Sequence, residues 1–379
     1  MPETVLVTGG TGYVGGWCIA ELLERGYRVR ATVRSHSREQ AVRDAVATRV
    51  DAEDRLEFAI ADLTSDEGWD TAVAGVDFVL HVASPMGGSG ATPEALVAAR
   101  DGALRVVSAA AQAGVRRVVM TSAANTASPS SYTEDSVTDE TLWTDPEDPT
   151  LIPYRRSKTL AERAAWDYMA AYEGPTELTT VLPGAVFGPI LSTATTGSTG
   201  IVAQMLSGAM PGVPRIGLEV VDVRDLADIH IRAMISPKAA GERFLATGEF
   251  IWMADMAQAL KKELGRDGEK VSTQEIPDEV VRANPAMGEI APALGRRNRH
   301  TTDKARIVLD WQPRPAPPAS PSPTAPAACS PTASSDDEHA LGARSAWFTI
   351  ASNPERGPPC TCWFSARPAW SATACSTPA

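Results

Sequence analysis

The sequence predicts an α/β fold, with a Rossmann-type, doubly wound parallel sheet and a smaller mixed part on its C-terminal side. Three observations predict it. Short apolar runs alternate with longer helical segments from residue 4 to about residue 185, a glycine-rich turn follows the first run, and this regularity fades from residue 186 onward. Near-continuous apolar strands that alternate with helices are typical of a parallel sheet covered on both faces.

Six apolar runs are expected to form the strands, at residues 4–9, 28–33, 56–62, 76–84, 116–122 and 177–184. Segments between them have the apolar spacing of helices, notably residues 13–25, 93–113 and 154–172. We therefore predict a Rossmann domain over residues 1–185.

Residues 186–312 are expected to form the smaller part, interleaved with the Rossmann core and closing over a substrate pocket. Residues 192–200 have the composition of a flexible loop, residues 220–235 read as a short strand leading into a helix, and residues 253–265 are amphipathic. Several methionines fall in this part, where they would adapt to a ligand or simply fill the core; they are Met205, Met210, Met253, Met256 and Met287.

The chain changes character at residues 313–379. From residue 316 it contains no Val, Lys or Tyr, and Pro, Ala, Ser and Thr dominate. Such a segment buries too little apolar surface to offset its ordering entropy, which predicts disorder. A frameshifted reading of a GC-rich gene is our hypothesis for this tail, and a genuine Pro-rich extension is the alternative. We assign no function to it.

Composition excludes several classes of partner and site. A net charge of −12 and a pI near 5.0 argue against nucleic acid or an anionic membrane as the main partner. No apolar run approaches the roughly 20 residues that span a bilayer, and the N-terminus lacks the pattern of a signal peptide. Five cysteines form neither a disulfide framework nor a metal-ligand spacing. The sequence therefore predicts a cytoplasmic protein without a metal.

The turn after the first strand carries a dinucleotide-binding fingerprint. Gly9, Gly12 and Gly15 give the pattern G-x-x-G-x-x-G between strand and helix, with Tyr13 and Val14 inside it. The first glycine permits the tight turn, the second lets the backbone approach a pyrophosphate, and the third allows close packing of helix on strand. The N-terminus of the helix then offers free N–H groups to the anion.

The end of the second strand indicates which cofactor binds. NAD sites place Asp or Glu there, whereas NADP sites use cations. Here Arg34 stands at the strand end with Arg38 nearby, and the first acidic residue is Glu39. We therefore expect NADP(H). Because strand ends converge on the ligand crevice, further cofactor contacts are expected at the ends of the third and fourth strands; these are Asp62, Leu63, Val82 and Ala83.

Tyr154 and Lys158 are the candidate catalytic pair. Their spacing of four residues places them on one face of the predicted helix, one turn apart. An ammonium group close to a phenol favours the phenolate, so we expect Lys158 to lower the pKa of Tyr154. Tyr154 would then exchange a proton with a substrate carbonyl near neutral pH, and Lys158 would also hold ribose hydroxyls of the cofactor.

With these motifs in place, the chain resembles the extended short-chain dehydrogenases/reductases. The resemblance runs from Val5 to about Trp311 and is greatest to the dihydroflavonol reductase, cinnamoyl-CoA reductase and aldehyde reductase branch. It rests on "VTGGTGYVGG", "VRATVR", "HVASP", "VVMTSA", "YRRSK" with "AERAAW", "LPGAVFGP" and "VDVRDLAD".

Membership would imply hydride transfer between nicotinamide and a carbonyl/alcohol pair, that is, an oxidoreductase acting on CH–OH groups. Tyr154 would be the acid/base and Lys158 its activator. The segment from Pro183 to Val186 would contact the nicotinamide end of the cofactor. The resemblance further implies a monomer or homodimer.

The chain departs from this branch at one position. The branch commonly has Thr-Ser-Ser at the end of the fifth strand, and its second serine binds the substrate carbonyl, but Ala123 stands there. A bulge or turn could bring Ser122 into the site, Thr126 or Ser128 could return from the following loop, or the site works without this hydroxyl. Ser122 is our candidate for the third catalytic residue.

The function that the sequence predicts is an NADPH-dependent carbonyl reductase acting on a small apolar or aromatic aldehyde or ketone. Two alternatives remain: a nucleotide-sugar epimerase or dehydratase with bound NAD, and a non-catalytic NADP-binding regulator. Arg34 argues against the first, and retention of Tyr154 with Lys158 argues against the second.

Overall fold

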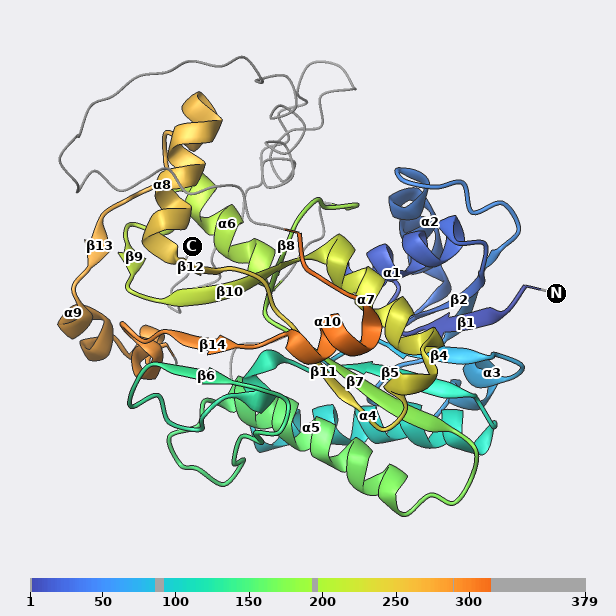
Figure 1. The fold of residues 1–379 in the computed structure, drawn as a ribbon. Coiled ribbons are helices and arrows are strands. Elements are labelled where there is room, and N and C mark those ends of the chain that lie inside the picture. The colour runs from blue at the N-terminus through green and yellow to red at the C-terminus, as the bar shows by residue number, and fades with distance from the viewer. Residues whose placement is uncertain (1, 86–91, 193–196, 289, 315–379) are drawn as a thin grey trace, which may run out of the picture.

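The computed structural model describes residues 2–85, 92–192, 197–288 and 290–314 (Figure 1). Its centre is a seven-stranded sheet in the order β11-β7-β5-β4-β1-β2-β3, and every neighbouring pair is parallel. The strands are β1 (Thr4–Val7), β2 (Arg28–Val33), β3 (Leu56–Ile60), β4 (Phe78–His81), β5 (Arg117–Thr121), β7 (Glu177–Pro183) and β11 (Arg243–Ala246). The predicted fold class is confirmed.

Helices cover both faces of this sheet and enclose two apolar cores. One face carries α1 (Tyr13–Glu24), α2 (Glu39–Ala47), α7 (Val223–Ile235) and α10 (Asp303–Leu309). The other carries α3 (Trp69–Val73), α4 (Pro93–Gln112) and α5 (Pro153–Ala170). Packing on both sides explains why the strands are apolar along their whole length rather than at alternate residues.

The smaller part, on the left in Figure 1, surrounds a mixed sheet in the order β12-β10-β8. It contains β8 (Ala185–Phe187), α6 (Ser198–Ser207), β9 (Val213–Pro214), β10 (Gly217–Asp222), β12 (Phe250–Trp252), α8 (Met253–Leu264), β13 (Glu275–Ile276) and α9 (Asp278–Ala283). A parallel pair, β6 (Ser136–Thr138) with β14 (Asn298–His300), joins it to the Rossmann part. All five methionines noted above pack in its apolar core, so they fill that core.

The two parts are interleaved. Strand β11 belongs to the large sheet, and helices α7 and α10 pack on one face of it. All three follow residue 185 in the chain. The expected loop at residues 192–200 is partly wrong, because α6 begins at Ser198; residues 193–196 lie outside the described residues. The tail beyond residue 314 also lies outside them, so its disorder stays a prediction.

The described residues contain neither a membrane-spanning helix nor a cluster of metal ligands. None of their helices is both long and apolar enough to cross a bilayer. Nor do these residues contain a group of three or more His, Cys, Asp or Glu side chains placed to hold a metal ion.

Candidate active site

The glycine turn between β1 and α1 has the close approaches that its sequence predicts. Gly9 has φ +72°, in the left-handed region that favours glycine. A Cβ on Gly15 would lie 2.4 Å from the carbonyl oxygen of Gly9, so a side chain there would force the turn apart. Gly12 is the N-cap of α1 and supplies no side chain to its first N–H groups. The turn therefore leaves a helix N-terminus open to an anion.

A cleft runs from this turn toward α2 and the segment after β8. It is lined by Gly10, Gly12, Tyr13, Arg38 and Leu191 among others. The Tyr13 phenol oxygen is buried without a hydrogen-bond partner among the described residues, and burial together with Asp222 raises its pKa. Val14 instead packs against the core beneath α1.

Two arginines follow β2, and their role in cofactor binding stays a prediction. Arg34 is exposed and makes no ion pair with the described residues, and Arg38 lines the cleft itself. The first acidic side chain after β2, Glu39, is bonded to His36. Positive charge therefore lies at the end of β2, with the Asp62 carboxylate after β3 near enough to Arg34 to have its pKa lowered by that charge.

Four residues after β3 and β4 were predicted to contact the cofactor: Asp62, Leu63, Val82 and Ala83. The Asp62 carboxylate accepts hydrogen bonds from the backbone N–H and hydroxyl of Thr64, which hold its pKa low, and Arg34 adds to the effect. Leu63 and Ala83 line a second cavity, described below. The backbone N–H groups of Val82 and Ala83 both donate to the Thr8 hydroxyl at 3.0 Å.

That second cavity lies at the ends of β4 and β5, under α4 and α5. Its polar lining residues are His81, Ser84, Thr121, Ser157 and Lys158, and the others are apolar. His81 was missed by the sequence reasoning, although a histidine in an otherwise apolar strand is a signal that could have found it. Thr121 carried no role in the prediction either.

Helix α5 brings Tyr154 and Lys158 to this edge of the sheet. Pro153 occupies its first turn, where the missing N–H costs nothing, and both side chains are half-buried one turn apart. The expected lowering of the Tyr154 pKa is wrong for this structure, because burial raises it. Burial lowers the pKa of Lys158 to about 8, against the opposing effect of the Glu162 charge.

The structure does not bring Ser122 into either cavity. Its side chain is 2% exposed, and its hydroxyl donates to Glu162 Oε2 at 2.6 Å. Successive strand residues face opposite sides, so Thr121 points toward His230 on α7 and Ser122 toward α5. No bulge reverses this alternation.

The other two candidate hydroxyls are also occupied. Thr126, in the short 3-10 turn after β5, has its hydroxyl within hydrogen-bond distance of Glu162 Oε2 at 2.6 Å and of the Ala123 carbonyl at 2.9 Å. Ser128 donates to the Ala124 carbonyl and bonds His300. Of the three alternatives left by Ala123, this geometry favours a site that works without that hydroxyl.

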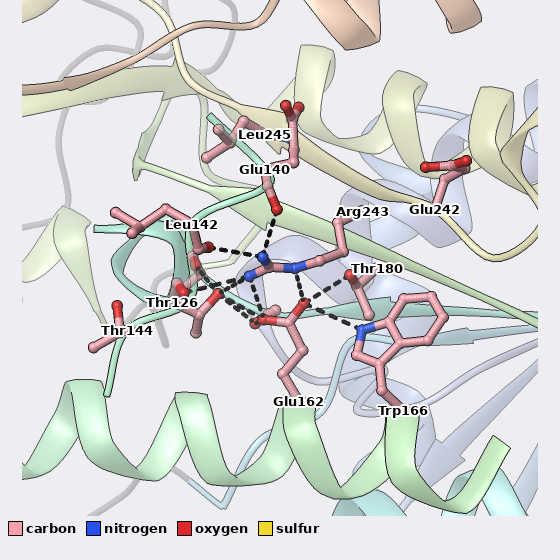
Figure 2. Close-up of polar contacts among 12 residues, drawn as sticks. Thr126, Glu140, Leu142, Thr144, Glu162, Trp166, Thr180, Glu242, Arg243 and Leu245 are labelled. Atoms are coloured by element: carbon pink, nitrogen blue, oxygen red, sulfur yellow. Dashed lines mark hydrogen bonds and ion pairs between the residues drawn. The ribbon is translucent and has the colours of Figure 1, made fainter. Parts of the chain in front are cut away.

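The hydroxyls of Ser122 and Thr126 instead contact Glu162. Glu162 is the centre of a buried polar cluster, shown in Figure 2. Arg243 from β11 donates through Nε to Glu162 Oε1 at 2.9 Å, and Thr180 from β7 donates to the same oxygen at 2.8 Å. Arg243 also donates to the carbonyls of Glu140 and Leu142. The cluster joins α5 to strands β7 and β11 and to the loops that follow β5 and β6.

The segment from Pro183 to Val186 leaves the end of β7 and enters β8. Pro183 is buried and opposite Ala246 of β11, and Val186 is opposite Val221 of β10. Just beyond, the Trp17 indole donates to the Pro189 carbonyl at 2.8 Å, which fastens the segment to α1. The segment therefore runs between the sheet edge and the glycine turn.

Comparison with known proteins decides the family. Residues 5–246 match the model of the NAD dependent epimerase/dehydratase family. The chain belongs to that family. This confirms the resemblance to extended short-chain dehydrogenases/reductases that the sequence motifs indicated.

Two curated relatives of this epimerase/dehydratase family member are plant reductases. Cinnamoyl-CoA reductase 1 of Oryza sativa subsp. japonica is 35% identical over 263 residues, which is 69% of this chain and 75% of the rice protein. The bifunctional dihydroflavonol 4-reductase/flavanone 4-reductase of Pyrus communis is 33% identical over 271 residues, 69% of this chain and 76% of the pear protein.

Solved structures agree on the fold. The crystal structure of Gre2 from Candida albicans in complex with NADPH superposes with a TM-score of 0.68 at 23% identity, and it covers 83% of this chain and 95% of that chain. Vestitone reductase from alfalfa superposes with a TM-score of 0.63 at 24% identity, covering 82% and 93%.

Proposed function

We propose that the protein is an NADPH-dependent carbonyl reductase that converts a small apolar or aromatic aldehyde or ketone to its alcohol. The observation that carries the proposal is the pair Tyr154 and Lys158, presented by α5 at the same sheet edge as the glycine turn. The reductase names of the plant relatives support it.

The residues at the sheet edge fit a phosphorylated dinucleotide. The turn from Gly9 to Gly15 has room only for backbone, so a pyrophosphate can approach the N–H groups that begin α1. Arg34 and Arg38 would hold the 2′-phosphate, because neither is neutralised by an ion pair within the described residues. Lys158 would hold ribose hydroxyls near the nicotinamide.

Bound NADPH would supply the hydride. Tyr154 would donate the proton, and Lys158 would stabilise the charge that this leaves. Because burial raises the pKa of Tyr154, its phenol keeps its proton at neutral pH and can donate it to the carbonyl oxygen as negative charge develops there. The Lys158 ammonium, whose pKa is about 8, is mostly charged at pH 7 and stabilises the phenolate that remains.

Cofactor choice separates this proposal from a nucleotide-sugar epimerase or dehydratase with bound NAD. An NAD site usually has a carboxylate at the end of β2, which binds the ribose hydroxyls. Arg34 occupies that place, and the nearest following carboxylate, Glu39, is bonded to His36. These contacts favour the reductase.

The test is oxidation of NADPH, compared with NADH, in the presence of a panel of aldehydes and ketones. A dihydroflavonol belongs in the panel because a relative carries that name. Cinnamoyl-CoA is tested beside the panel as a thioester, whose reduction would release coenzyme A and leave an aldehyde. Tyr154→Phe should lower kcat about 10²–10⁴-fold, the usual contribution of a positioned general acid. Tyr168→Phe, on the same helix and stacked on Tyr172, is the matched control and should not.

Binding of NADPH without turnover of any carbonyl would favour the non-catalytic regulator. A Tyr154→Phe variant as active as the Tyr168→Phe control would contradict the proposed mechanism.

A further inference from the structure

The 3-10 turn Ala124–Ala127 follows β5 directly after Ala123, the position at which the resembling reductases have a serine for the substrate carbonyl. The methyl group of Ala123 offers no hydrogen bond. The hydroxyls of Ser122, Thr126 and Ser128 are all bonded within the protein. A carbonyl oxygen that gains negative charge during a reaction is stabilised by donors that already point at it. The strand end therefore lacks such a donor unless another side chain supplies it.

Asn125 lies two residues after Ala123 and carries an amide group with no partner. Its backbone carbonyl accepts a hydrogen bond, but its side chain makes none with the residues that the structure describes. The side chain is half-buried. An amide offers two N–H donors and stays uncharged, and asparagine is among the residue types that form oxyanion-binding sites in enzymes.

The geometry of the turn gives the direction of the Asn125 side chain. A 3-10 helix has three residues per turn, so residues three apart share one side of it. Ala124 and Ala127 share the side that packs in an apolar cluster with β7 and β11. Thr126 faces Glu162 on α5. Asn125 therefore occupies the third side, which is covered by neither of these contacts.

The backbone that carries Asn125 is held in place by the chain around it. The buried Thr144 hydroxyl donates to the Asn125 carbonyl at 2.7 Å, and the Thr144 N–H donates to the Thr126 carbonyl at 3.0 Å. The Thr126 N–H in turn donates to the Ala123 carbonyl at 2.9 Å. A donor on a fixed backbone needs little reorganisation when charge develops nearby.

The same turn packs against α5, the helix that presents Tyr154. Arg155, the residue after Tyr154, is 3% exposed and donates to the carbonyls of Pro129 at 2.6 Å and Ser130 at 3.0 Å. These two carbonyls belong to the loop that leaves the turn. The turn and the first residues of α5 are thus tied together at the edge of the sheet where the carboxyl ends of the strands converge.

We propose that Asn125 is a catalytic residue whose side-chain amide donates a hydrogen bond to the substrate carbonyl oxygen, in place of the hydroxyl that Ala123 lacks. The amide transfers no proton, so Tyr154 remains the acid. Its hydrogen bond strengthens as the carbonyl oxygen becomes negative, and it therefore acts mainly on the transition state. This inference rests on the proposed function, because it concerns the same reaction at the same site.

The test measures reduction of the carbonyl that the parent turns over fastest, in the parent and in Asn125→Leu. Leucine keeps the branched shape of the side chain but has no donor. We expect kcat to fall about 10²-fold, the usual effect of losing one such donor, with a smaller change in KM. Asn125→Asp, which replaces the donor by a negative charge, should lose at least as much. The Kd for NADPH and the melting temperature should stay as in the parent, because the side chain makes no hydrogen bond with the described residues.

Ala123→Ser is the matched control, since it returns a hydroxyl to the strand end. Combined with Asn125→Leu it should raise kcat about tenfold or more over Asn125→Leu alone, whereas in the parent it should change kcat less than about threefold. This dependence on Asn125 would not arise if the asparagine only completed the turn.

A kcat for Asn125→Leu or Asn125→Asp within about threefold of the parent would overturn the proposal. So would a fall in kcat that comes with weaker NADPH binding or a lower melting temperature, or one that Ala123→Ser does not relieve. Turnover by the parent tests the proposed function, and the ratio of variant to parent tests this inference, so the two failures are distinguishable. A parent without turnover of any carbonyl overturns both.

Discussion

The buried ion pair between Glu162 and Arg243 should be the most sensitive single point in the fold. The side chain of Glu162 is 0% exposed and that of Arg243 is 8% exposed. The carboxylate accepts hydrogen bonds from Ser122, Thr126 and Thr180 in addition to Arg243 (Figure 2). Glu162→Gln keeps the shape of the side chain but leaves the Arg243 guanidinium buried without a counter-charge.

Removing one partner of a buried pair typically costs about 3–5 kcal/mol. Arg243 keeps its bonds to the carbonyls of Glu140 and Leu142, which favours the lower end of that range. Glu53→Gln is the matched control, because Glu53 is 67% exposed and lies 3.6 Å from Arg55. Exposed pairs of this kind contribute roughly 0–1 kcal/mol.

The assay is urea denaturation of both variants and the parent, with the free energy of unfolding taken at equal m-values. A double variant, Glu162→Met with Arg243→Met, should be more stable than Glu162→Gln alone because it contains no unpaired charge. If Glu162→Gln is destabilised by no more than Glu53→Gln, the assignment of Glu162 and Arg243 as a coupled buried pair is refuted.

Three further predictions concern the site. Replacing Arg34 and Arg38 together by alanine should weaken NADPH binding about 100-fold and NADH binding little, measured by fluorescence titration; equal losses would contradict a 2′-phosphate contact. Ser122→Ala should lower the free energy of unfolding by about 1.5–3 kcal/mol, the loss of a bond to a carboxylate, while kcat changes less than threefold; a 100-fold fall in kcat would restore Ser122 to the catalytic group. Because the pKa of Lys158 is lowered to about 8, its ammonium is lost as pH rises through 8, so kcat/KM for reduction should fall above that pH; a profile flat to pH 10 would exclude this role.

The sheet and the cofactor turn could be predicted because their signals are local. The six expected strands are rich in apolar residues and alternate with helical segments, and the glycines of the turn are dictated by backbone geometry within seven residues. The seventh strand, Arg243–Ala246, was missed because it has only four residues and lies beyond residue 185, where this regular alternation fades. That arginine is buried only because Glu162, 81 residues earlier, pairs with it.

The chemistry of the site was less accessible to sequence reasoning because it depends on distant partners. The direction of Ser122 follows from strand alternation, but its bond to Glu162 could not be read from the sequence. His81 is bonded to the Thr8 hydroxyl, 73 residues away, and the Thr121 hydroxyl to His230, 109 residues away. The pKa of Tyr154 was predicted in the wrong direction because burial, which the sequence does not show, raises it.

Single-turnover transfer of deuterium tests the central claim most directly. The enzyme is mixed with NADPH deuterated at C4 of the nicotinamide and a carbonyl from the active panel, and the product is analysed by mass spectrometry. With deuterium at both C4 positions of the cofactor, the account predicts one deuterium on the carbinol carbon, formed about 10²–10⁴-fold more slowly by Tyr154→Phe than by Tyr168→Phe. An unlabelled product, or equal rates in the two variants, would contradict carbonyl reduction with Tyr154 as the proton donor.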